Sequence, residues 1–159
     1  MNLKLRRVVT GHNAEGKAVV LKDEICRNVS SRRSGPEGCV VWTTDTSPAD
    51  NNGEFHGGSR QTGTTMPNGT VFRIVRYEPG VTPRMHRSDS IDYAVVLEGS
   101  IVMQLGDGVE VMLHAGDALV QRGTIHNWIN RGSMHCVIAF VLIDAKPVAI
   151  GGQKLSAVN

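Results

Sequence analysis

Short β-prone runs recur at close intervals between residues 71 and 142, and this rhythm constrains the fold more than any other feature. The runs are separated by turn signals such as Glu78-Pro-Gly80 and Gly106-Asp-Gly108. Short strands at such regular spacing are typical of a β-sandwich or barrel. The pattern therefore predicts an all-β protein, with strands at 71–77, 93–97, 101–105, 109–113, 118–121, 124–129 and 135–142.

Length and charge narrow the class of protein further. A chain of 159 residues is one domain by size, and 18 Gly and 6 Pro suit many short strands joined by turns. The net charge is only +2, and the Lys and Arg residues are dispersed along the chain. We therefore expect a small-molecule partner and no nucleic-acid partner.

The cysteine pattern and the length of the apolar segments indicate where in the cell the protein is located. Cys26, Cys39 and Cys136 are an odd set without a C-x-x-C pair, which favours reduced thiols over disulfides or a structural zinc site. Residues 1–10 lack the apolar run of a signal peptide, and no segment approaches transmembrane length. The sequence thus predicts a cytoplasmic protein without a membrane partner.

The segments that flank the β-rich region have a different character. Residues 5–10 and 17–21 read as a hairpin around a polar Asn-Gly turn region, and residues 38–44 read as a further strand. Residues 47–69 are almost free of apolar side chains and predict a long loop, which suits a lid or an interface arm. The tail has one short apolar piece at 147–150, which could pair as an edge strand.

Two motif halves lie within the β-rich region. The first runs from Gly80 through His86, Ser88 and Asp92 to Gly99, and the second runs from Gly116 through Gln121, Gly123 and His126 to Asn130. In this frame they resemble the two motifs of the cupin family, G-x5-H-x-H-x3-4-E-x6-G and G-x5-P-x-G-x2-H-x3-N. The sequence departs from the family pattern at three positions, where Ser88 replaces a metal-binding His, Asp92 replaces Glu and Gln121 replaces Pro.

The resemblance implies a cupin-type double-stranded β-helix, or jelly-roll barrel, with extra N-terminal strands. We expect the barrel at 71–145, N-terminal strands and the long loop at 1–70 packed on the barrel or a dimer interface, and a tail at 146–159. It also implies a homodimer in which the N-terminal strands pack across the interface.

Candidate ligands for a metal ion follow from the two motif halves. In an extended strand His86, Ser88 and Asp92 share one face, and the resemblance places His126 across the same cavity. His86, Asp92 and His126 would form a two-His, one-carboxylate site for a divalent ion such as Fe, Mn, Zn or Ni. The alternative is a metal-free polar cavity in which both His side chains are hydrogen-bonded and a small ligand binds.

Other polar residues of the same strands are candidates for contact with a substrate. Arg73 and Arg76 have opposite parity on one strand, so only one of them should face inward and clamp a carboxylate. Gln121 and Trp128 are further candidate substrate-binding residues. Ser88 and Tyr93 are candidates for a catalytic proton relay.

Three functions fit this site. The variant motifs resemble a branch of small cupins in bacteria and fungi, some near biosynthetic genes and linked to decarboxylation, dehydration or ring chemistry on small acids. The first hypothesis is therefore an enzyme, a metal-assisted lyase of the decarboxylase or dehydratase type, acting on a small organic acid or polyketide-like substrate. The alternatives are a non-haem iron dioxygenase and a non-catalytic cupin that binds a small molecule.

Overall fold

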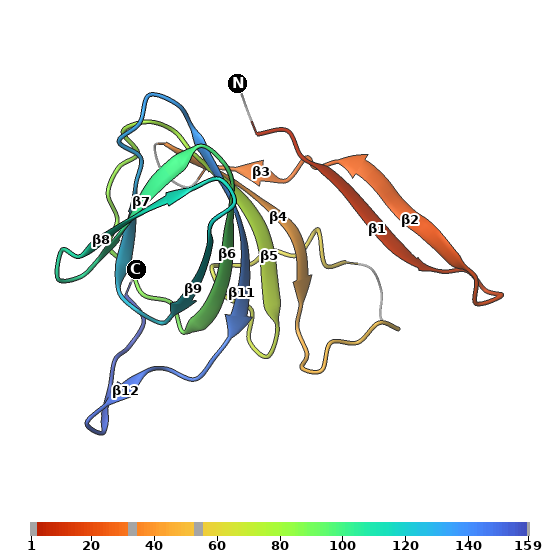
Figure 1. Cartoon of the computed structure of the whole chain (residues 1–159). Coiled ribbons are helices and arrows are strands. Elements are labelled where there is room, and N and C mark those ends of the chain that lie inside the picture. Colours follow the sequence, from red (N-terminus) through yellow and green to blue (C-terminus); the bar gives the residue numbers. More distant parts are fainter. Residues whose placement is uncertain (1–2, 32–34, 53–55, 159) are drawn as a thin grey trace.

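Two antiparallel sheets form the body of the protein in a computed structural model, which describes residues 3–31, 35–52 and 56–158 (Figure 1). The larger sheet has the strand order β3-β4-β5-β11-β6-β9 and the smaller one the order β10-β7-β8. The strands of these two sheets are β3 (Val29–Ser30), β4 (Pro36–Thr44), β5 (Thr70–Tyr77), β6 (Ser90–Glu98), β7 (Ser100–Leu105), β8 (Glu110–His114), β9 (Ala118–Arg122), β10 (His126–Ile129) and β11 (Cys136–Asp144).

The described residues contain no helix, so the all-β prediction is confirmed, and each strand expected between residues 71 and 142 is present. Strand β4 pairs with β5, which makes residues before Thr70 part of the barrel sheet itself. The part of the chain that the structure describes has no helix that could span a membrane.

The core lies between the two sheets, and strand alternation builds it. Cys136, Ile138, Phe140 and Leu142 of β11 all face inward and are buried, because residues two apart share one face of a strand. They pack with inward residues of the facing sheet, including Trp128. Tightly packed interiors of this kind hold a cavity wall in a fixed shape.

Turn residues keep the strands in register. Gly99, between β6 and β7, has a φ of 75°, and a Cβ there would lie 2.4 Å from the carbonyl oxygen of His135. Only glycine meets both conditions. Asn130 is buried and its Nδ2 donates to the carbonyl oxygens of Tyr77, at 3.0 Å, and Met134, at 2.9 Å, which ties the turn after β10 to the end of β5.

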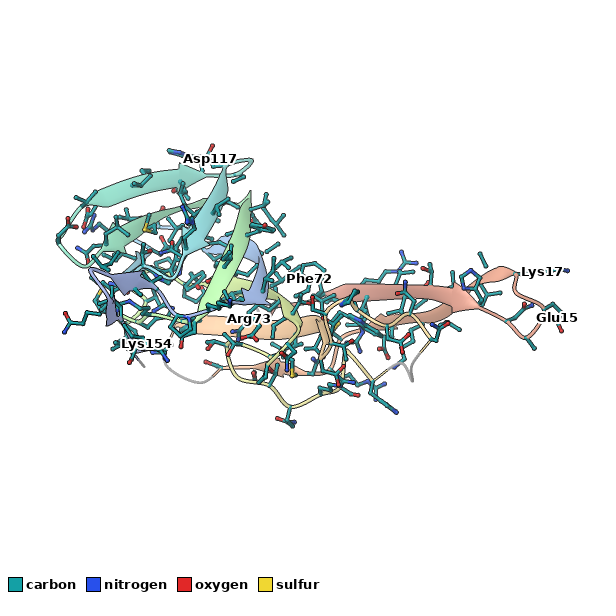
Figure 2. The ribbon with its side chains drawn as sticks, turned by 90° about the horizontal axis from the view of Figure 1, so that it is seen from below. Glu15, Lys17, Phe72, Arg73, Asp117 and Lys154 are labelled. Carbon is teal, nitrogen blue, oxygen red and sulfur yellow. The ribbon has the colours of Figure 1, made fainter. Side chains whose placement is uncertain are left out.

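The N-terminal hairpin leaves the barrel as an arm. Strands β1 (Arg6–His12) and β2 (Ala18–Ile25) pair only with each other, and the tip near Glu15 and Lys17 lies far from the barrel (Figures 1 and 2). Arg7 is buried at the base of the arm, where its Nη1 donates to the carbonyl oxygen of Gly58 at 3.0 Å.

The segment between β4 and β5 contains no strand among its described residues, in agreement with the expected long loop. Its residues Gly57 and Gly58 are buried against Trp42 and Arg7. The tail forms a small hairpin of β12 (Ala149–Ile150) and β13 (Gln153–Lys154). The short strand expected at 147–150 is therefore present as β12, and it pairs with β13.

Candidate active site

A cavity of about 680 Å³ opens between the two sheets. Alternate residues of β5 supply one wall, and Trp128 of β10 and the segment before β6 supply another. The loop before β5 lies at its edge. The lining residues are Ser30, Pro36, Gly38, Gly63, Thr64, Thr65, Arg73, Val75, Tyr77, Arg84, His86 and Trp128. Its size and its mixture of aromatic and charged groups suit a small organic ligand.

Two histidines meet at the floor of this cavity. His86 and His126 exchange two backbone hydrogen bonds of 2.9 Å, and their ring centroids lie 4.2 Å apart. His86 lines the cavity, whereas His126 is only 3% exposed and lies outside the set of lining residues. His126 also meets Trp128 edge-on, with ring centroids 5.8 Å apart.

The same backbone geometry orients both imidazoles. The Nδ1 atom of His86 lies 3.0 Å from the carbonyl oxygen of Arg84, and that of His126 lies 3.0 Å from the carbonyl oxygen of Thr124. A carbonyl can only accept, so each neutral ring carries its proton on Nδ1 and a lone pair on Nε2. Burial lowers the pKa of His126, the hydrogen bond to Thr124 acts in the opposite direction, and the charge of Arg84 lowers the pKa as well. The net effect favours the neutral ring.

A second polar group lies on the larger sheet. The Ser90 hydroxyl donates to Asp92 Oδ1 at 2.6 Å, and both side chains are buried on the inward face of β6. Burial raises the pKa of Asp92, while the Ser90 hydrogen bond and the charge of Arg73 act in the opposite direction. Asp92 is therefore a buried carboxyl group that accepts a hydrogen bond from Ser90 and interacts electrostatically with Arg73.

Among the described residues, the three predicted metal ligands His86, Asp92 and His126 do not converge as one group. No group of three His, Cys, Asp or Glu side chains in the described part of the chain is placed to hold a metal ion. The expectation treated residues 86–92 as one strand, but β6 begins at Ser90 and His86 pairs with β10 instead. The two imidazoles have the tautomer that a metal needs, whereas Asp92 is engaged elsewhere, so the residues do not fit a three-ligand site.

The structure separates the other candidate residues into two groups. Arg73 and Trp128 line the cavity (Arg73 is labelled in Figure 2), so Arg73 is the inward arginine. Arg76 points away from the cavity, and its Nη2 lies 2.8 Å from Glu78 Oε1. Arg76 is therefore not a lining residue of this cavity, and alternation along β5 explains why only Arg73 is.

Three further candidates lie outside the lining of the cavity. Tyr93, expected as a proton relay, is 51% exposed on the outer face of β6, opposite in direction to Asp92, and is not among the lining residues of this cavity. Gln121 is buried beside Asp92 on the neighbouring strand, and its Nε2 donates to Thr124 Oγ1. Ser88 is half-buried just before β6 and does not line the cavity.

Sequence reasoning missed two groups that do line the cavity. Tyr77 shares the parity of Arg73 on β5, and its ring centroid lies 6.2 Å from that of Trp128. Arg84 also lines the cavity, but it lies in a segment outside any strand, where side-chain alternation makes no prediction.

Comparison with known proteins agrees with this architecture. The family model described as "Cupin domain" matches residues 73–143. A cupin-domain-containing oxidoreductase of Aspergillus ruber, fogC, is 34% identical over 94% of this chain and 77% of its own length. The chain belongs to the cupin family. Cupins commonly bind a divalent metal.

Two other similar proteins extend the comparison. The phomopsin biosynthesis cluster protein C' of Diaporthe leptostromiformis is 37% identical over 96% of this chain and 85% of its own length. A solved structure from Klebsiella pneumoniae, of an uncharacterized conserved protein with a double-stranded beta-helix domain, has a TM-score of 0.52. It is 19% identical over 74% of this chain and 84% of that chain, so it supports the cupin fold alone.

Proposed function

We propose that this cupin is an enzyme that binds a small organic acid in the cavity and moves a proton with His86. The reaction type that suits these groups best is that of a lyase, a dehydration or a decarboxylation. The observation that carries the proposal is the His86 imidazole, which is held by Arg84 in the tautomer with a basic Nε2 and lines a cavity that also contains two guanidinium groups.

Each group has a chemical task in such a reaction. An arginine in the cavity would hold the substrate carboxylate and stabilise negative charge as it develops on the adjacent carbon. In a dehydration, His86 would take the proton from that carbon and return it to the departing hydroxyl, which leaves as water. In a decarboxylation, His86 would first take up a proton from solvent at Nε2 and would deliver it to the carbon once carbon dioxide has left.

The metal-assisted form of this reaction needs more than the described residues provide. Of the three ligands expected from the sequence, only His86 and His126 converge, and Asp92 is held by Ser90. We therefore assign no step to a metal and derive the proposal from the side chains alone.

An oxidoreductase is the second candidate. The A. ruber relative carries that name, and a 33% identical relative of Hypocrea virens, virC, carries it too. A non-haem iron dioxygenase would be one form of this candidate, and it would consume oxygen during turnover.

A turnover screen separates these functions. Wild-type protein and His86→Gln are incubated with a panel of 3-hydroxy and 3-oxo acids, and the products are measured by mass spectrometry beside an oxygen electrode. We expect a wild-type product that has lost water or carbon dioxide, without oxygen uptake, and no product with His86→Gln. Oxygen uptake coupled to product formation would favour the oxidoreductase, and ligand binding without any product would favour a binding module.

A further inference from the structure

We propose that Arg84 is the residue that binds the substrate carboxylate, and that the cavity selects a monoanionic acid with an unsaturated or aromatic body. This inference rests on the proposed function and makes it more specific. It distinguishes Arg84 from Arg73, the arginine that the sequence singled out.

The charges around the cavity distinguish the two arginines. The charge of Arg73 acts on Asp92, where it opposes the rise in pKa that burial causes. Among the residues that the structure describes, no carboxylate lies within ion-pair distance of Arg84. A half-buried cation without a counter-ion is unfavourable, and a ligand carboxylate would supply the missing charge through a bidentate contact.

The backbone of Arg84 is fixed beside the reacting group. Its N–H donates to the buried Asn127 Oδ1 at 2.8 Å, and its carbonyl oxygen accepts from His86 Nδ1 at 3.0 Å. The backbone of a single residue therefore orients the imidazole and also carries the guanidinium. A carboxylate on Arg84 would place the adjacent carbon of the same ligand toward His86, which is the relation that proton transfer needs.

The rest of the lining indicates the body of the ligand. The rings of Tyr77 on β5 and Trp128 on β10 line the cavity from two different walls, and Thr64 and Thr65 offer hydroxyl groups on the loop before β5. Aromatic walls favour a flat apolar body. No described carboxylate lies within ion-pair distance of Arg84, so one ligand carboxylate would supply its counter-charge.

Calorimetric titration with matched probes tests this assignment. Cinnamate is the monoanion, cinnamamide is its neutral counterpart and phthalate is a dianion. We expect wild-type protein to bind cinnamate about 10- to 100-fold more tightly than cinnamamide, the range of a charge-assisted hydrogen bond, and to bind phthalate more weakly than cinnamate. Arg84→Gln should reduce the cinnamate preference to about threefold or less, and Arg84→Lys should restore part of it.

Arg87→Gln is the matched control, because Arg87 is in the same segment but lies on a separate surface depression, where its Nη1 donates to the Ser156 carbonyl oxygen. It should bind the probes as the wild type does, and thermal unfolding of each variant shows whether it is folded. If Arg84→Gln keeps the wild-type preference and Arg73→Gln loses it, the assignment of Arg84 is overturned while the acid-binding function stands. If wild-type protein binds neither acid, both proposals fail.

Discussion

His86 and His126 lie side by side, with ring centroids 4.2 Å apart and a pair of backbone hydrogen bonds of 2.9 Å between them. They come from the two cupin motifs, 40 positions apart in the chain. His86 lines the cavity and can contact a ligand. His126 is buried against His86 and helps to hold the His86 ring in place.

The stability of the protein should depend on pH through Asp92. Burial raises its pKa above the ordinary value of 3.8, so the native state binds this proton more tightly than the unfolded chain does. The resulting stabilisation is fully present below the unfolded pKa and is lost as pH rises through the native pKa. We therefore expect the wild type to lose free energy of unfolding relative to Asp92→Asn as the pH rises from about 4, near the unfolded pKa of Asp, to about 7.

Urea denaturation of both proteins across this pH range measures the effect. Ser90→Ala is a useful companion, since it removes the hydrogen bond that favours the ionised carboxylate and should raise the native pKa further. A constant difference between wild type and Asp92→Asn at all pH values would contradict the burial of this carboxyl.

Asn130 should contribute to stability rather than to chemistry. Its Nδ2 holds the carbonyl oxygens of Tyr77 and Met134, and its Oδ1 accepts from the N–H of Gly132 at 3.0 Å. Asn130→Ala leaves buried backbone groups without these partners and should cost about 2–4 kcal/mol. Chemical denaturation measures this loss, with the exposed Asn52→Ala as a control that should cost about 0.5 kcal/mol or less.

The sequence predicts those features of the site that are set within a single strand, and it fails for those that depend on contacts between distant segments. Alternation along β5 correctly limits the cavity to one of its two arginines, because parity within a strand is a local property. The fold followed from the strand rhythm and the motif resemblance. The three predicted metal ligands are not brought together because alternation does not run through residues 86–89: His86 joins β10 by a bridge before β6 begins.

The partnership of Arg84 with Asn127 depends on contacts between segments that are 43 positions apart. Local periodicity carries no information on such long-range contacts. The hydrogen bond from Arg84 to Asn127 and the pairing of β4 with β5 could therefore not be predicted from the sequence.

The buried thiols should be slow to react in the native protein. All three cysteines are free and buried. Burial, with a smaller effect of the neighbouring Cys26, raises the pKa of Cys39 to about 12, and burial raises that of Cys136 to about 11. The thiolate is the reactive species, so iodoacetamide at mildly alkaline pH should label these two residues only after denaturation. Rapid labelling of either residue in native protein would contradict their burial.

A metal ion, where bound, should not depend on Asp92. The carboxyl group is held by Ser90 and lies apart from the histidine pair. After loading with Fe²⁺, Mn²⁺, Zn²⁺ or Ni²⁺, we expect elemental mass spectrometry to find equal metal in wild type and Asp92→Asn. Loss of stoichiometric metal in Asp92→Asn, as in His86→Ala and His126→Ala, would support the three-ligand site that the sequence suggested.

The predicted homodimer has a candidate surface. The outer face of β6 and β9 carries large apolar side chains that are 41–58% exposed, namely Tyr93, Val95, Leu97 and Val120. The arm exposes Val8, Val20 and Ile25 as well. Two-stranded hairpins are marginally stable alone, and exposed apolar patches of this kind mark interfaces. We therefore propose that a second copy covers these surfaces.

Light scattering with size-exclusion chromatography tests the dimer. We expect wild-type protein to elute as a dimer and Val95→Glu to shift toward the monomer at micromolar concentration, because a charge would be buried in the interface. The matched control is Val109→Glu, an exposed apolar residue in the turn between β7 and β8. A monomeric wild-type protein would contradict the proposal.

Deuterium incorporation from D₂O tests proton transfer by His86 most directly. Nuclear magnetic resonance follows the hydrogens next to the carboxylate in a panel of small 3-hydroxy and 3-oxo acids, with wild-type protein, His86→Gln and Arg87→Gln. We predict that wild type and Arg87→Gln exchange these hydrogens faster than buffer alone, and that His86→Gln does not. Equal exchange with wild type and His86→Gln, or no exchange above buffer for any acid, would contradict the account.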